Sequence, residues 1–203
     1  ECNFDCCYCH PNIALKKNRP LSHKLEGIKL AEIFLSLNQN FYVSMSGGEP
    51  FMLPNFVEFC KLITEKENEF SVDTNLTNRA LLQDFTKKIN PDRVRIINAA
   101  EHISERERLG LSINDFVEDI KLLQDKKFSV NVFYVLFPEL FSRFKSDVDY
   151  LMENGVHKVS LKLFKGIYQG KIYPNSYTSE QREQIKSFEK NRLSSYSSTW
   201  QPH

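Results

Sequence analysis

The sequence predicts an α/β protein built on a parallel sheet. Short apolar runs that fit buried strands alternate along the chain with longer segments whose apolar residues recur at helical spacing. This strand–helix order implies right-handed crossovers and a parallel sheet, which can curl into a partial barrel. The expected strands are 41–45, 70–73, 93–98, 128–137 and 156–163.

Helices are expected between these strands, and several of them have end signals. Ser112 suits the N-cap of one helix, and Asn154-Gly155 is a usual stop for another. Residues 101–108 mix charges of both signs, which predicts a solvated helix or loop. The expected helices are 25–37, 56–63, 79–89, 113–127 and 140–153.

The pattern changes after Phe164, which predicts two parts, a core domain at 1–164 and a tail at 165–203. The tail begins with a stretch rich in Tyr, Gly and Lys, continues as one polar helix at 179–190, and is Ser-rich and expected to be ill-ordered from 192. We expect it to be a connector leading towards a C-terminal domain outside this sequence. Because the first residue is Glu1 and a cysteine follows at once, we also expect a segment of a longer protein.

Composition excludes several classes of function. The 203 residues, 41% hydrophobic and 26% charged, suit a soluble globular protein. The net charge of +1 gives no reason to expect a nucleic-acid partner. No apolar run is long enough to span a membrane.

Five cysteines are present, and four of them fall within eight residues at the start of the chain. An odd, bunched set is unlike a disulfide framework and indicates a metal site in a reducing, cytoplasmic protein. The fifth, Cys60, lies on an apolar helix face and is expected in the core.

Cys2, Cys6 and Cys9 are spaced four and three residues apart, which in a helical winding turns three thiolates to one side. Cys7, about 100° from Cys6, should point elsewhere. Three thiolates fit a [4Fe–4S] cluster with one iron open to a small molecule, whereas a ferredoxin-type cluster uses four. A structural zinc site that adds His10 fits the cysteines equally well.

A Gly-Gly-Glu-Pro turn, Gly47-Gly48-Glu49-Pro50, ends the first expected strand. In parallel α/β folds, ligands bind at the carboxyl ends of strands. Paired glycines let the backbone approach a ligand closely, and Glu49 could accept hydrogen bonds from an ammonium group. A Gly-Gly pair alone is ordinarily just a turn, but here it follows the cysteines by about one βα unit.

Together, Cys-x3-Cys-x2-Cys with Tyr8 before its last cysteine and the Gly-Gly-Glu-Pro turn resemble the radical S-adenosylmethionine (SAM) superfamily, from Cys2 to about Phe164. The resemblance implies a partial (β/α)6 TIM-like barrel whose first strand precedes Glu1. It implies a [4Fe–4S] cluster and SAM as cofactors, and a 5′-deoxyadenosyl radical that abstracts hydrogen from substrate. It also raises the expectation of a C-terminal domain of the SPASM-like group, with auxiliary clusters.

The same resemblance implies roles for individual residues. Cys2, Cys6 and Cys9 would hold the cluster, and Tyr8 would lie near the adenine. The Gly47–Pro50 turn would meet the SAM amino group.

Two further strand ends carry candidates for cofactor binding. Thr74 and Asn75 stand where relatives often carry Thr-Asn-Gly, and since Leu76 replaces the glycine, that turn is expected to differ. Asn98 is a candidate for binding the ribose hydroxyls. The interpretation that it is an ordinary loop residue is equally good.

These observations predict a radical SAM enzyme acting on a peptide or protein, with a flavodoxin or ferredoxin as electron donor. One alternative is a non-enzymatic zinc module on an α/β domain. Another is an electron-transfer iron–sulfur protein, which would need Cys7 or Cys60 as a fourth ligand and leaves the Gly47–Pro50 turn unexplained.

Overall fold

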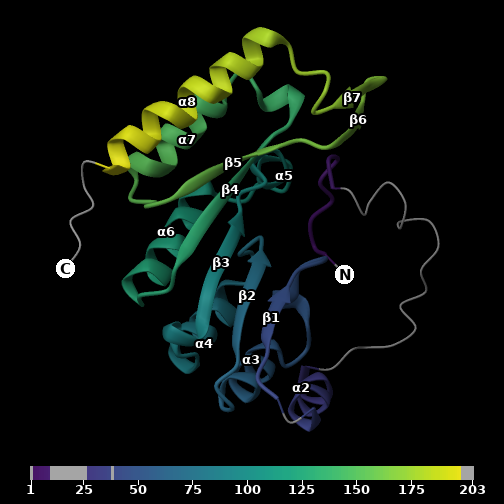
Figure 1. Cartoon of the computed structure of the whole chain (residues 1–203), viewed down its shortest axis with the longest axis vertical. Helices are drawn as coiled ribbons and strands as arrows, with labels where there is room; N and C mark the ends of the chain where they lie inside the picture. The colour runs from purple at the N-terminus through teal and green to yellow at the C-terminus, as the bar shows by residue number, and fades with distance from the viewer. Residues whose placement is uncertain (1, 10–26, 38, 198–203) are drawn as a thin grey trace.

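The computed structural model describes residues 2–9, 27–37 and 39–197, and the side chains up to residue 190. Five parallel strands form one sheet in the order β1-β2-β3-β4-β5 (Figure 1). This confirms the α/β class and the parallel sheet that the sequence predicts. The strands are β1 (Tyr42–Met45), β2 (Glu69–Thr74), β3 (Val94–Ala100), β4 (Val130–Leu136) and β5 (Val159–Leu163).

Helices alternate with these strands. Two of them begin or end where the sequence signals predict. The Ser112 hydroxyl accepts the backbone N–H groups of Asn114 and Asp115 at the start of α6, and Gly155 adopts a φ of +97° just after α7. The helices are α2 (Gly27–Ser36), α3 (Phe56–Thr64), α4 (Arg79–Lys88), α5 (Ile103–Arg108), α6 (Ile113–Asp125), α7 (Phe144–Glu153) and α8 (Ser179–Ser197).

The two faces of the sheet differ in character because side chains alternate along each strand. On one face Phe70, Ile97 and Val132 are buried in a core shared with the helices. On the other, Asp73, Asn98 and Asn131 stand side by side in register on β2, β3 and β4. Asn98 Nδ2 donates to Asp73 Oδ1 at 2.8 Å. The sheet thus presents a polar face away from its helices.

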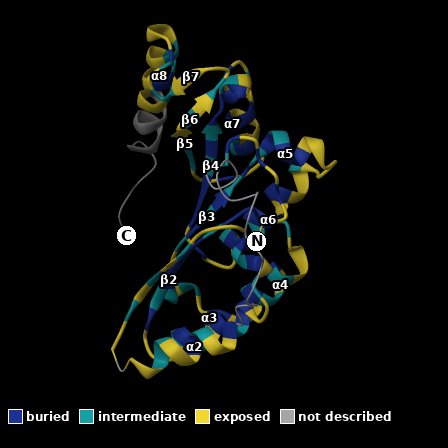
Figure 2. Cartoon of the chain, turned by 90° about the vertical axis from the view of Figure 1, so that its right-hand side faces the viewer, coloured by how far each residue is buried: buried dark blue, intermediate teal, exposed yellow. Residues whose placement is uncertain are grey.

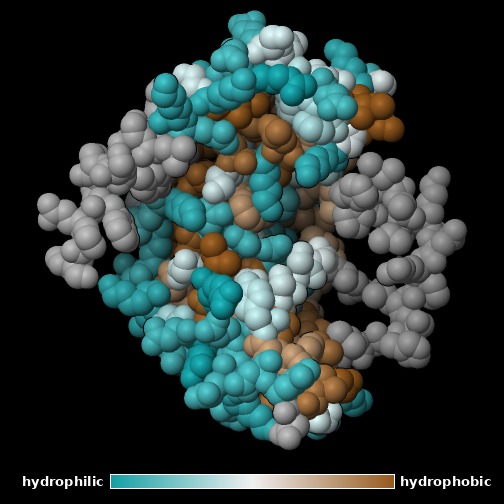
Figure 3. Space-filling view, in the orientation of Figure 1, coloured by the Kyte–Doolittle hydropathy of each residue, from teal (hydrophilic) through white to brown (hydrophobic). Residues whose placement is uncertain are grey.

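The C-terminal part is more ordered than its composition predicts. Strands β6 (Gly166–Tyr168) and β7 (Lys171–Tyr173) form an antiparallel hairpin that was not predicted from the sequence. Its two isoleucines, Ile167 and Ile172, are exposed and form a small apolar surface (Figure 3). Helix α8 continues to Ser197, so the expected loss of order from residue 192 is wrong as far as 197. Residues 198–203 lie outside the described residues.

Helix α8 packs against α7, and both helices carry buried positions (Figure 2). The rings of Phe144 and Phe188 lie 5.3 Å apart, and Ile185 is buried. The Tyr177 hydroxyl donates to the carbonyl of Leu136 on β4. The tail from residue 165 therefore contacts the sheet domain directly, and the domain boundary at 164 stays a prediction.

A second core cluster lies at the carboxyl end of β4 and joins the cysteine loop (residues 2–9) to the C-terminal half. Phe4, Cys6 and Tyr8 belong to it, together with residues of β4, α7 and α8. One side of the cysteine loop is therefore buried in the hydrophobic interior. Among the helices that the structure describes, none is both long and apolar enough to cross a membrane.

Candidate functional site

The cysteine loop presents its thiols in different environments. Cys6 is buried, Cys9 is half-buried, and Cys2 and Cys7 are exposed. A tight turn closes the second half of the motif, since the Cys9 N–H donates to the Cys6 carbonyl at 3.1 Å. None of the five cysteines forms a disulfide.

Tyr8 fixes the loop against the end of the sheet. Its ring centroid lies 5.2 Å from that of Phe137, just past β4, and 5.7 Å from that of His102, just past β3. The Tyr8 hydroxyl lies 3.1 Å from His102 Nδ1. Burial lowers the pKa of His102 to about 4 and raises that of Tyr8, so both groups are neutral near pH 7.

The Gly-Gly-Glu-Pro turn follows β1 directly. Gly47 and Gly48 are exposed, whereas Glu49 is buried. Gly47 adopts a φ of +134°, and a Cβ there would meet no atom within 4 Å. The glycine is thus required by its backbone conformation rather than by crowding from this chain. Pro50 begins a short 3-10 helix, η1 (Pro50–Met52), which Glu49 caps.

The Glu49 carboxylate joins the end of β1 to the end of β2. Its Oε1 accepts the Phe51 N–H at 3.0 Å and the Thr74 hydroxyl at 2.7 Å, and its Oε2 accepts the Asn75 N–H at 2.6 Å. Burial raises the pKa of Glu49, and these three donors oppose the rise. Whether this carboxylate also meets a ligand ammonium group stays a prediction, but it holds the next candidate residues in place.

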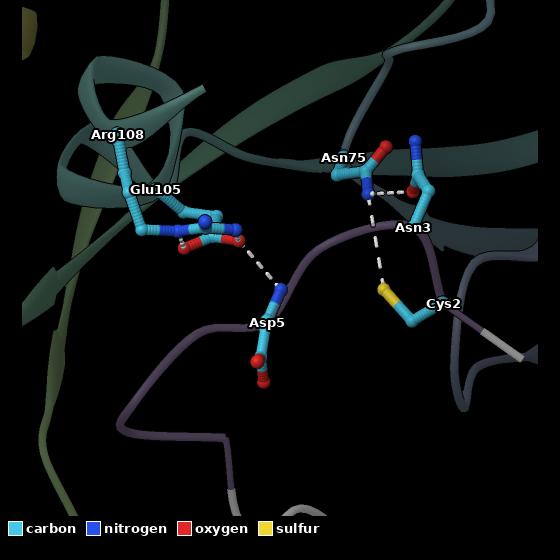
Figure 4. A network of polar contacts seen from close by, with 6 residues as sticks. All are labelled: Cys2, Asn3, Asp5, Asn75, Glu105 and Arg108. Carbon is cyan, nitrogen blue, oxygen red and sulfur yellow. Dashed lines mark hydrogen bonds and ion pairs between the residues drawn. The ribbon is translucent and has the colours of Figure 1, made fainter.

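Asn75 links this turn to the cysteines (Figure 4). Its Nδ2 donates to Asn3 Oδ1 at 2.8 Å and lies 3.9 Å from the Cys2 sulfur. The next residue, Leu76, adopts a φ of +52°, the left-handed conformation that glycine takes most readily. The turn after Asn75 therefore keeps a glycine-like backbone although leucine occupies it.

The structure thus brings most of the predicted residues to one edge of the sheet. The cysteine loop lies beside the ends to which the β1–β3 arrows point (Figure 1), and Glu49, Thr74 and Asn75 connect to it through hydrogen bonds. Asn98 is not part of this hydrogen-bonded set, because its side chain binds Asp73 on the polar face. Its role stays a prediction.

The expectation of a solvated segment at 101–108 is wrong. Glu105 and Arg106 on α5 are both 4% exposed. Arg106 donates to the carbonyl of Asn75 and, at 2.7 Å, to that of Glu101, and its guanidinium lies 4.4 Å from the centre of the Phe116 ring. Glu105 accepts the N–H of Asp5 in the cysteine loop at 2.6 Å.

The position of these residues in the chain could have indicated their role, but the mixed charges of the segment predicted a solvated one instead. Helix α5 follows the carboxyl end of β3, the edge where a parallel fold places its ligands. Alternating charges at that position predicted solvation, since side chains of this type are seldom buried unless they are paired. Here both are paired, Glu105 with the guanidinium of Arg108 and Arg106 with backbone carbonyls.

The donor set fits a [4Fe–4S] cluster. All three thiols lie on one short loop, and burial raises the pKa of Cys6 to about 12, with Glu105, Cys9 and Cys2 acting on it electrostatically in the same direction. Among the described residues, no three Cys, His, Asp or Glu side chains converge on a single metal ion. Thiolates of a cluster bind different irons and need no such convergence. His10 of the zinc alternative lies outside the described residues.

Comparison with known proteins gives matches in family and in fold. The family description "Radical SAM superfamily" matches residues 1–151. No curated protein matches the chain in sequence. Streptococcus suis SuiB bound to S-adenosylmethionine superposes with a TM-score of 0.67 at 14% identity, covering 96% of this chain and 46% of SuiB.

Other solved structures share the fold at similar distance. The protein anSMEcpe with bound AdoMet superposes with a TM-score of 0.61 at 17% identity, covering 92% of this chain and 56% of the other. The same protein with AdoMet and the Kp18Cys peptide covers 93% of this chain, again with a TM-score of 0.61. The chain spans about half the length of these structures. Because the family match extends over most of the sequence and includes both the cysteine loop and the Gly47–Pro50 turn, this chain belongs to the radical SAM superfamily.

Proposed function

We propose that the protein is a radical SAM enzyme whose cluster is held by Cys2, Cys6 and Cys9. When bound, the [4Fe–4S] cluster supplies an electron that cleaves SAM to methionine and a 5′-deoxyadenosyl radical, which takes a hydrogen atom from substrate. The observation that carries this proposal is the bond of Asn75 to the Cys2 sulfur. It places a three-thiol loop against the strand-end turns of a parallel sheet.

The chain's own residues would bind and orient the cofactor. Gly47 and Gly48 leave open backbone beside the loop for the SAM amino group. Glu49 accepts three hydrogen bonds and so fixes the shape of this turn before any ligand arrives. The Tyr8 ring packs against Phe137 and His102, and we infer that it lies near the adenine as part of an apolar wall. Such preorganisation of polar groups is what a protein contributes to cofactor chemistry.

We further propose a peptide or protein substrate that binds along the polar face of the sheet. The half-buried Asp73 and Asn98 offer donors and acceptors suited to backbone amides, and the buried Asn131 lies beside them, bound to Ser160. Lys162 on β5 lies over the Phe133 ring, with Nζ 3.3 Å from the ring centre. It adds a positive charge on the same face of the sheet. The fold shared with the peptide-bound anSMEcpe structure supports this proposal.

The proposal extends to an electron donor and a compartment. A cluster that is reduced in each cycle needs a small redox protein, a flavodoxin or ferredoxin. Thiolate ligands persist in a reducing compartment, and the cysteines of the loop, which form no disulfide, are suited to the cytoplasm. We also keep the division into a core at 1–164 and a tail at 165–203 as part of this proposal.

The test is anaerobic reconstitution with iron and sulfide, followed by addition of SAM and a chemical reductant. We expect about four irons per chain, a brown protein and formation of 5′-deoxyadenosine. A Cys6→Ala variant prepared in parallel should show neither cluster nor product. A colourless wild-type protein that binds zinc instead of iron would contradict the proposal and favour the zinc module.

A further inference from the structure

We propose that Glu105, paired with Arg108, is a positioning residue that anchors the cysteine loop to α5 and sets the charge beside its cluster. This inference rests on the proposed function. It concerns two residues whose segment the sequence marks only as mixed charge. Neither residue is expected to touch the cluster or SAM.

The first contact is a hydrogen bond from the loop backbone. The N–H of Asp5, the residue before Cys6, donates to Glu105 Oε1 at 2.6 Å (Figure 4). A hydrogen bond to a carboxylate is about twice as strong as one between neutral groups. The Glu105 side chain is only 5% exposed, so the acceptor end of this bond is shielded from water. It fixes the backbone between Cys2 and Cys6.

Arg108 holds the carboxylate in that position. Its Nε donates to Glu105 Oε2 at 2.9 Å and its Nη2 donates to Oε1 at 2.7 Å. Such a two-point pair fixes the plane of the carboxylate and not merely its position. Oε1 accepts from both Arg108 and Asp5, so the guanidinium orients the oxygen that binds the loop.

The neighbouring residue ties the other side of the loop to the same helix. Arg106 donates to the carbonyl of Asn75, whose side chain binds Asn3 and the Cys2 sulfur. Consecutive residues of α5 therefore reach the backbone before Cys6 and, through Asn75, the sulfur of Cys2. Helix α5 is thus a platform for two of the three thiolates.

The charges of the pair should affect the cluster in opposite directions. Glu105 is a buried carboxylate that binds the backbone N–H of Asp5, the residue before Cys6, so its negative charge lies beside the cluster site. A negative charge nearby disfavours adding an electron, and the exposed Arg108 partly offsets it. Removing the charge of Glu105 should therefore raise the reduction potential of the cluster, and removing that of Arg108 should lower it. A purely structural anchor gives no such opposition of sign.

The experiment compares Glu105→Gln and Arg108→Gln in the reconstituted chain, by redox titration followed by electron paramagnetic resonance. We expect the ratio of reduced to oxidised cluster at fixed potential to rise about tenfold in the first variant, equivalent to about 59 mV for one electron. It should fall in the second. Iron per chain should fall in Glu105→Ala, which cannot accept the Asp5 N–H.

Glu118→Gln and Lys121→Gln are the matched controls, because they break another i,i+3 ion pair, on α6. They should leave the potential unchanged. Shifts of the same sign in both test variants, or shifts no larger than the controls, would overturn the inference while leaving the proposed function intact. Absence of a cluster from the wild-type chain would instead overturn the proposed function, and this inference with it.

Discussion

Single residues of the cysteine loop differ enough in environment to be tested one by one. Replacing Cys2, Cys6 or Cys9 by Ala should reduce iron from about four per chain to nearly none, because two thiolates cannot hold a cluster that needs three. Cys7→Ala is the matched control, since Cys7 is an exposed neighbour of the buried Cys6. Iron analysis and the absorbance of the reconstituted protein measure the effect. Equal loss from all four variants would show that the ligands are misassigned.

Gly47 allows a second test, directed at SAM. Gly47→Ala places a Cβ where the backbone φ is +134° and strains the turn by about 1–3 kcal/mol, so SAM affinity should fall about tenfold or more. Gly110→Ala is the control, because Gly110 also has a positive φ, +66°, and open space around it. Calorimetric titration of SAM into both reconstituted variants measures the change. An unchanged affinity in Gly47→Ala would count against the role of this turn.

The sequence identified most of the candidate site at this scale but not how its residues are connected. Glu49, Thr74 and Asn75 follow two strands and were predicted at one edge, where they meet. That Glu49 would bind Thr74 and Asn75 of its own chain could not be predicted, because it depends on the register between β1 and β2. Glu105 was missed because local composition cannot show that a charged residue finds a buried partner.

At the scale of elements, the junction between β3 and α5 carries a buried acid. Both carboxylate oxygens of Glu101 are buried, and no side-chain or backbone partner is found for them in the described part of the chain. Burial raises the pKa of Glu101 to about 8, Asp147 and Glu107 add to the rise, and Arg106 and Arg143 oppose it. The folded protein therefore keeps a proton that the unfolded chain releases near its ordinary value.

This difference predicts a pH-dependent stability. Between about pH 4.5 and pH 8 the folded state binds the extra proton, so the free energy of unfolding should fall as pH rises through this window and level off above it. Glu101→Gln cannot titrate, so its stability relative to wild type should improve by up to about 4 kcal/mol from pH 4.5 to pH 9. Urea unfolding of both proteins at several pH values measures the gap. A constant gap would show that Glu101 is ionised normally.

The strands of the main sheet were predicted better than the β6–β7 hairpin and the length of α8. All five strands of the main sheet were found because buried parallel strands are continuous apolar runs. The β6–β7 hairpin was missed because its turn, Gln169-Gly170, lacks the Asn or Asp that usually marks such a turn, although both residues adopt positive φ. Helix α8 was predicted short because its Ser-rich end lacks apolar periodicity.

At the scale of the whole molecule, the cysteine loop and the C-terminal helix share one hydrophobic cluster. Cys6 and Tyr8 belong to the same buried set as Ile185 of α8, with Phe144 and Leu136 among the residues between them. Segments more than 170 residues apart in the sequence thus stabilise one another. The tail after residue 164 accordingly supports the candidate site as well as extending the chain.

Ile185→Ala tests this coupling. The side chain is 7% exposed, so truncating it should lower the free energy of unfolding by about 2–4 kcal/mol through lost burial and the cavity left behind. Ile167→Ala is the control, because Ile167 is 67% exposed on the hairpin and its loss should cost within about 0.5 kcal/mol. Since the cluster is shared, hydrogen exchange should also quicken at the amides of the cysteine loop in Ile185→Ala. Faster exchange confined to α8 would show instead that the tail is an independent appendage, because a loop that does not depend on α8 keeps its protection when α8 is weakened.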